Sequence, residues 1–138
     1  MKGSLLGMLA GCLAGLLIGC SADEPVDTSD PRVKDIAFET ALAVRAWASG
    51  GPAGLYPYMG VAVKSICSEA EFVADLAGDT QPQSYEQLRG VEFGENAARI
   101  KITVLTTKGE AKMTWTYNLQ RDAHWVPIEV PGLEKCRP

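Results

Sequence analysis

Residues 98–120 read ARIKITVLTTKGEAKMTWTYNLQ, and this stretch decides the fold. Apolar and polar side chains alternate on both sides of Lys108-Gly109-Glu110, which is the pattern of two half-buried strands joined by a tight turn. The apolar positions are Ala98, Ile100, Ile102 and Val104 before the turn, and Met113, Trp115, Tyr117 and Leu119 after it. Strands joined this closely are antiparallel neighbours, so the pattern predicts an antiparallel sheet with one apolar face.

The same sheet is predicted to extend on either side of this hairpin. Leu88 to Phe93 forms a short preceding strand, which Gly94-Glu95-Asn96 turns into the hairpin, and Gly78 to Ser84 is predicted to be loop. Arg121-Asp122-Ala123 turns the chain into a last strand from His124 to Val130. The sequence therefore predicts a meander of four strands.

Helical periodicity precedes the strands. Asp30-Pro31 is typical of a helix N-cap and first position, and Gly50-Gly51-Pro52 is predicted to stop this helix. Gly54 to Ile66 is predicted to form one or two short helical pieces, and Ser68 to Glu71 is a capping box that begins another helix. The predicted inner face of the first helix consists of Val33, Ile36, Ala37, Ala41, Val44, Trp47 and Ala48. We therefore expect an α+β fold, with N-terminal helices packed on one face of a curved four-stranded antiparallel meander.

The N-terminal residues, MKGSLLGMLAGCLAGLLIGC, have the organisation of a secretory signal. Lys2 supplies a positive charge, and Leu5 to Ile18 is an uncharged apolar run. The run ends in Leu17-Ile18-Gly19-Cys20, which resembles the lipobox of bacterial lipoproteins. The resemblance implies cleavage before Cys20, attachment of lipid to the Cys20 thiol, and anchoring of the mature chain to a membrane.

An uncleaved membrane anchor is the alternative for this segment. Glycine recurs at every fourth residue from Gly3 to Gly19, a spacing that lets membrane helices pack together. The apolar stretch is, however, at the short limit of roughly 17–25 residues for a span.

Ser21 follows the predicted lipidated cysteine. Since Asp at that position retains lipoproteins in the inner membrane, the resemblance implies the periplasmic face of the outer membrane in a Gram-negative cell. In a cell with one membrane it implies the outer face of the plasma membrane.

The chain divides into three parts. Residues 1–19 are the predicted lipoprotein signal peptide, residues 20–29 are the lipidated cysteine and a flexible tether, and residues 30–138 form a single α+β domain. The formal net charge is −4, and removal of Lys2 would make the mature chain more acidic. Such a chain lacks the basic surface that binds nucleic acid or holds anionic lipid. We therefore predict no nucleic-acid partner and a membrane contact through lipid alone.

The four cysteines have separate predicted roles. Cys12 leaves with the signal peptide and Cys20 carries lipid, so Cys67 and Cys136 remain. Two thiols in an exported, oxidising compartment most simply form a disulfide. The alternative is a reactive Cys67 at the start of a helix, where the helix dipole lowers the pKa of a thiol. The sequence has no CxxC motif and no nearby histidine to support that alternative.

The order of elements resembles a known superfamily. Helices followed by a curled meander with a Trp-bearing last strand are similar to the nuclear transport factor 2-like, or cystatin-like cone, fold. Residues 55–76, LYPYMGVAVKSICSEAEFVADL, resemble the second-helix region of exported members, and residues 123–131, AHWVPIEVP, resemble their closing strand. The likeness covers approximately residues 30–131. It implies a cone with a mouth between helix and sheet, in a fold that serves enzymes, binding domains and assembly subunits alike.

The large aromatic and flexible side chains are candidates for lining that mouth. A pocket for a small apolar ligand would be lined by Trp47, Tyr56, Tyr58, Met59, Trp115, Tyr117 and Trp125. The alternative is that these residues fill the core, because Trp115 and Tyr117 share the alternating face of Met113 and Leu119.

No catalytic residue, metal site or cofactor is predicted. His124 is the only histidine and is interpreted as a strand-edge residue, since a zinc site or a serine triad needs more partners than one imidazole supplies. Glu69, Glu71 and Asp75 are interpreted as solvated carboxylates favoured by a helix N-terminus. Isomerases of the resembling superfamily place an Asp and a Tyr in the mouth, and no residue here matches that pair.

These patterns favour a non-catalytic envelope lipoprotein whose domain binds another envelope protein or a small apolar ligand. The periplasmic domain of a type IV secretion bridging subunit, which acts through protein contacts, is a comparable case in the resembling fold. The alternative is an isomerase- or dehydratase-like enzyme that uses the cone pocket. A buried ionisable group in a deep pocket favours the enzyme, whereas an exposed apolar patch favours partner binding.

Overall fold

The computed structural model describes residues 26–79 and 81–138. The predicted signal peptide, Cys20, Ser21 and most of the predicted tether lie outside these described residues. Among the helices in the described ranges, none combines the length and the hydropathy needed to cross a bilayer.

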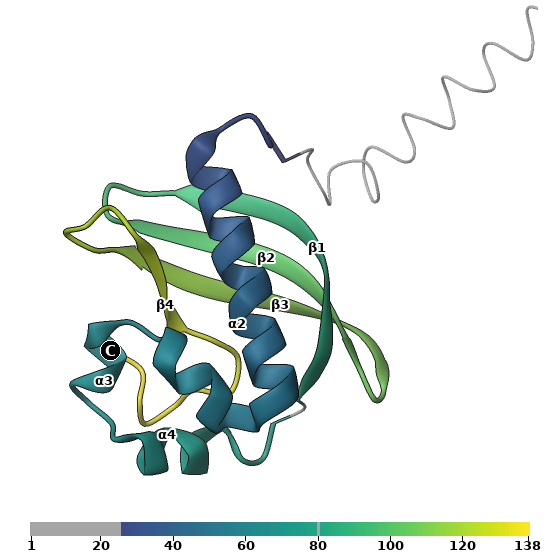
Figure 1. The fold of residues 1–138 in the computed structure, drawn as a ribbon, viewed down its shortest axis with the longest axis vertical. Coiled ribbons are helices and arrows are strands. Elements are labelled where there is room, and N and C mark those ends of the chain that lie inside the picture. Colours follow the sequence, from purple (N-terminus) through teal and green to yellow (C-terminus); the bar gives the residue numbers. More distant parts are fainter. Residues whose placement is uncertain (1–25, 80) are drawn as a thin grey trace, which may run out of the picture.

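One layer of the fold is an open antiparallel sheet with the strand order β1-β2-β3-β4 (Figure 1). Its strands are β1 (Pro82–Phe93), β2 (Ala97–Thr106), β3 (Gly109–Leu119) and β4 (Trp125–Glu129). The strands β2 and β3 pair without a register shift, which confirms the predicted central hairpin. Gly109 begins β3 with φ 107°, a conformation that favours glycine. Thr106 Oγ1 donates to the Gly109 carbonyl at 2.9 Å and closes the turn.

A long helix, α2 (Pro31–Leu55), crosses the inner face of the sheet (Figure 1). Asp30 caps it by accepting a hydrogen bond from the Arg32 N–H at 2.9 Å, as the sequence predicts. Its buried residues above the sheet are Val33, Ile36, Thr40, Ala43, Val44 and Trp47. The strand residues buried beneath it include Ala98, Ile100, Ile102, Val104, Met113, Trp115 and Tyr117. The predicted α+β fold, with helix on one face of a four-stranded meander, is confirmed.

The predicted stop of this helix is a kink rather than an end. Gly51 has φ 68° and ψ −163°, so the helix is interrupted there, but helical residues resume at Pro52 and continue to Leu55. Gly54 packs against the backbone of Ala46 so closely that a Cβ at this position would clash. The absence of a side chain at both glycines therefore lets the chain fold back against the helix it is leaving.

The remaining helical segments lie at the C-terminal end of α2. They are η1 (Tyr56–Tyr58), α3 (Val61–Lys64) and α4 (Glu69–Leu76), and the first two confirm the expected short helical pieces. Ser68 Oγ accepts from the Glu71 N–H at 3.3 Å, and the Ser68 N–H donates to the Glu71 carboxylate at 3.0 Å. This reciprocal pair is the predicted capping box.

The first strand is longer than predicted. It begins at Pro82 rather than Leu88, so the loop expected from Gly78 to Ser84 ends earlier. Register shifts interrupt its pairing with β2 in three places. Each shift breaks the two-residue alternation from which a strand is recognised, and proline is tolerated as the first residue of an edge strand.

The buried face of α2 is also displaced from the prediction. Ala37, Ala41 and Ala48 are only half-buried, whereas Thr40 is fully buried. Thr40 Oγ1 donates to the Ile36 carbonyl at 2.6 Å. The fully buried Tyr117 hydroxyl, on β3, hydrogen-bonds to the same Thr40 oxygen and is therefore the donor.

The Thr40–Tyr117 hydrogen bond satisfies two polar groups inside the core. Leaving the Tyr117 hydroxyl without a partner there would cost about 1–3 kcal/mol. Burial raises the pKa of Tyr117, although the hydrogen bond with Thr40 opposes this, so the hydroxyl stays protonated and able to donate.

Tyr117→Phe tests this contact. We expect the free energy of unfolding to fall by about 1 kcal/mol, because the donor is lost while the ring keeps its packing. Urea denaturation followed by tryptophan fluorescence measures the change. Tyr58→Phe is the matched control, because within the described ranges the half-buried Tyr58 hydroxyl makes no hydrogen bond. An equal loss in both variants would contradict the assignment.

Candidate functional site

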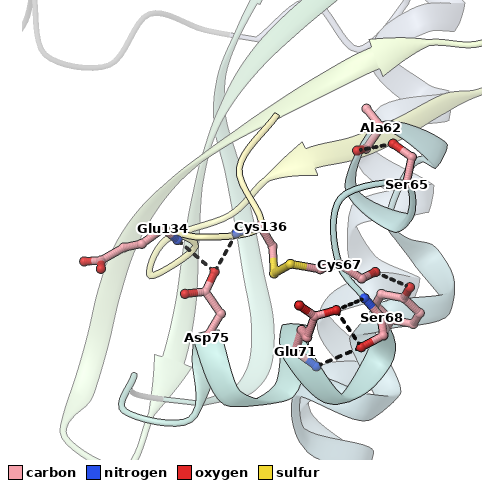
Figure 2. Close-up of a disulfide and its surroundings, with 9 residues drawn as sticks. Ala62, Ser65, Cys67, Ser68, Glu71, Asp75, Glu134 and Cys136 are labelled. Atoms are coloured by element: carbon pink, nitrogen blue, oxygen red, sulfur yellow. Dashed lines mark hydrogen bonds between the residues drawn. A yellow bond between two sulfur atoms is a disulfide. The ribbon is translucent and has the colours of Figure 1, made fainter.

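A disulfide joins the C-terminal tail to the start of α4 (Figure 2). Cys67 and Cys136 have Cα atoms 5.5 Å apart, and both side chains are buried. The predicted pairing is confirmed, and the alternative of a free reactive Cys67 is wrong. The two residues are 69 positions apart, so closing this loop constrains the unfolded chain by about 4 kcal/mol in the chain-entropy account.

Asp75 of α4 holds the same tail by hydrogen bonds (Figure 2). Its Oδ2 accepts from the backbone N–H groups of Glu134 and Cys136, each at 3.0 Å. The interpretation of Asp75 as a solvated carboxylate near a helix N-terminus is therefore wrong, since it lies in the last turn of α4 and binds the tail. Partial burial raises the pKa of Asp75, but the N–H groups of Cys136, Glu134 and Lys135 together outweigh it and lower the pKa below 3.8.

The seven predicted pocket residues lie in and around the core. Five are at most 4% exposed: Trp47, Met59, Trp115, Tyr117 and Trp125. The other two, Tyr56 and Tyr58, are half-buried against the core. The ring centroids of Trp47 and Trp115 are 6.2 Å apart, and Trp115 stacks with Tyr117 at 6.3 Å. This is the contact geometry of a packed interior, and a ligand pocket among these residues stays a prediction.

A surface groove lies between α2 and β1. Its volume is ≈ 610 Å³, and it is lined by Phe38, Ala41, Leu42, Arg45, Ala48, Ser49, Gln83, Ser84 and Tyr85. Phe38 is 62% exposed, and Tyr85, whose pKa is raised by burial, forms part of the wall. Sequence reasoning missed this groove. The available signal was Phe38 itself, an aromatic residue on the polar side of an amphipathic helix.

A second hollow, of ≈ 480 Å³, lies between α3 and the hairpin of β3 and β4. Val61 is 66% exposed at its edge, and Leu119, Val126 and Ile128 contribute further apolar surface. The molecule therefore presents apolar side chains at two separate hollows, one between α2 and β1 and one between α3 and the β3–β4 hairpin.

Ionisable side chains converge where α2 passes the turn between β3 and β4. Asp35 and Glu39 are one turn apart on α2, and His124 directly precedes β4. One metal-binding atom from each lies within 4.8 Å of the others, with the two carboxylates half-buried and the imidazole exposed. Sequence reasoning considered His124 alone, because its partners are far away along the chain. The only local signal was the spacing of the two acids.

No protein-family model matches the chain, and no curated protein matches it closely enough to count as a relative. What the protein does is therefore inferred from its own residues.

The hydrogen bonds to Asp75 predict a pH-dependent stability. A carboxyl whose folded pKa lies below its ordinary value of 3.8 stabilises the fold above that value, and this contribution is lost as pH falls through the folded pKa. We expect Asp75→Asn to lower the melting temperature at neutral pH, with the difference from the unmodified protein disappearing in acid. Thermal unfolding by circular dichroism across this pH range measures the effect.

Glu134→Gln is the control for that series. The Glu134 backbone N–H binds Asp75, while its side chain makes no hydrogen bond or ion pair with the described residues. A Glu134→Gln profile that matched the Asp75→Asn profile would show that general loss of negative charge is responsible.

Proposed function

We propose that this chain is an exported domain, anchored by lipid on Cys20 to the outer side of a membrane, that binds a partner protein or a small apolar ligand in the cell envelope. The observation that carries the proposal is the buried Cys67–Cys136 disulfide. Disulfides persist in exported proteins and are rare where cellular reductants keep thiols reduced. Because Cys67 and Cys136 are paired with each other, neither of them competes for the Cys20 thiol.

The N-terminal pattern supports the anchor. Leu17-Ile18-Gly19-Cys20 resembles a lipobox and follows an apolar run that begins after Lys2. Two or three acyl chains on one cysteine hold a protein durably, at ~0.8 kcal/mol for each buried methylene. Ser21 favours the outer membrane over the inner one if the host is Gram-negative.

The groove between α2 and β1 supports a binding role. Its ≈ 610 Å³ falls within the usual range of about 300–1,000 Å³ for ligand sites. Phe38 and Leu42 offer apolar contact, while Arg45 and Ser49 add groups that can orient a ligand. Phe38 is 62% exposed and lines the groove together with Leu42, so this surface offers apolar area that a ligand or partner can cover. The order of helices followed by a meander also supports the resemblance to the nuclear transport factor 2-like superfamily, which includes binding domains.

Cys20→Ser tests the anchor. Cells supplied with an alkyne-bearing fatty acid are expected to label the unmodified protein and to leave Cys20→Ser unlabelled, because the serine hydroxyl does not form the thioether. Cys12→Ser is the matched control and keeps its label, since Cys12 is predicted to leave with the signal peptide. Label retained in Cys20→Ser, or a mature mass that still contains residues 1–19, would refute the anchor.

A photo-reactive phenylalanine analogue at position 38 tests the groove. In native membranes it is expected to crosslink a partner, and the added mass distinguishes a protein from a small apolar ligand. The control places the analogue at Leu105, which is 37% exposed on β2 and is not part of the groove. Equal crosslinking at both positions, or none at Phe38, would count against a binding role for the groove.

A further inference from the structure

We propose that Asp35, Glu39 and His124 form a binding site for a divalent transition-metal ion of the zinc type. An imidazole nitrogen with carboxylate oxygens is a donor set that Zn²⁺ uses in proteins. The three side chains come from two distant segments, α2 and the turn before β4, and meet with their ligand atoms within 4.8 Å of one another.

The spacing of the three ligand atoms is close to what a zinc ion requires. With metal–ligand distances of about 2.0–2.2 Å, ligand atoms in a tetrahedral site stand roughly 3.3–3.6 Å apart. In the structure the three ligand atoms lie within 4.8 Å of one another. Small side-chain rotations can bring them from this spacing to the tetrahedral one. Because the imidazole of His124 is exposed, it can make such an adjustment without disturbing the core.

The three side chains are not engaged elsewhere in the described part of the chain. No hydrogen bond or ion pair with described residues involves the carboxylates of Asp35 and Glu39 or the imidazole of His124. Here the ligand atoms approach without pairing, so metal binding would break no existing interaction.

Electrostatics at this position favours a cation. Two carboxylates one helical turn apart repel each other. Arg32, one helical turn before Asp35 on α2, is directed to Asp30, with Nη2 2.8 Å from Oδ2. Its guanidinium also lies 3.9 Å from the centroid of the Phe93 ring. The Arg32 guanidinium is therefore held by Asp30 and the Phe93 ring and does not pair with Asp35 or Glu39.

The turn before β4 keeps His124 beside the helix. The His124 backbone N–H donates to the Asp122 carboxylate at 3.3 Å, and its carbonyl accepts from the Gln120 N–H at 2.9 Å. These bonds fix the backbone on both sides of the residue and leave the imidazole free to coordinate. Metal binding would then link the first half of α2 to the β3–β4 turn.

Three protein ligands leave at least one coordination position for water. An open site of this kind binds its metal more weakly than a closed site with four protein ligands, and the bound ion stays accessible from solution. Since the ion would bind the folded chain only, it should raise thermal stability, and above its dissociation constant this rise grows with the logarithm of the ion concentration.

Zinc titration of the mature chain, prepared without a polyhistidine tag, tests the proposal. Isothermal calorimetry is expected to show saturable binding of one ion for each chain, together with a rise in the melting temperature. His124 is the only histidine, so the imidazole resonances in an NMR spectrum belong to it alone and are expected to shift with the same stoichiometry. Binding that leaves these resonances unchanged, or no saturable binding, overturns the proposal.

Variants locate the site. His124→Ala and the double variant Asp35→Asn/Glu39→Gln are expected to weaken zinc binding at least tenfold. Circular dichroism verifies that each variant remains folded. The control is Glu69→Gln/Glu134→Gln, which also removes exposed carboxylates but lies outside the cluster and should bind zinc like the unmodified chain. Equal weakening in the control would assign the binding to general negative charge and refute the site.

Discussion

The apolar face of β2 and β3 has to be kept from water, and the position of α2 across it determines most of the remaining structure. A helix with its side chains is about 10–12 Å wide, whereas four strands spaced about 4.8 Å apart form a sheet of roughly 15 Å or more. One helix therefore cannot cover the whole face. The short helices and the C-terminal tail complete the cover at one end, while the margin between α2 and β1 remains as the groove around Phe38.

The same packing decides which polar atoms can enter the core. Thr40 lies on the helix face nearest the sheet, and its hydroxyl bonds both to its own helix and to Tyr117 of β3. A Val at that position would fill similar space but leave the Tyr117 hydroxyl buried without an acceptor. The hydrogen bond thus constrains the helix to one position along β3, which a purely apolar contact would fix less strictly.

The parts that the sequence predicts well depend on local chemistry. Unbroken alternation around Gly109 identified the central hairpin, and the caps at Asp30 and Ser68 identified two helix starts. The disulfide followed from the small number of cysteines left after the N-terminal segment. The start of β1 was not predictable, because its register shifts remove the alternation.

Contacts between distant segments of the chain could not be predicted from the sequence either. The contact between Thr40 and Tyr117 and the approach of His124 to Asp35 depend on how α2 is placed on the sheet. Neither partner has a local pattern that reveals the other. The aromatic residues were recognised as a group, but their division between interior and surface depends on the same placement.

The position of the disulfide has a mechanical consequence. All four strands and α4 lie in the segment between Cys67 and Cys136, and the cross-link bypasses that segment. Tension applied between the N-terminal and C-terminal ends would travel along α2 and its following turns to Cys67, then through sulfur to Cys136. Under such a load the helix is the element that can be drawn out, whereas the strands cannot be extended while the bridge is intact. Reduction would place the entire sheet in the path of the force.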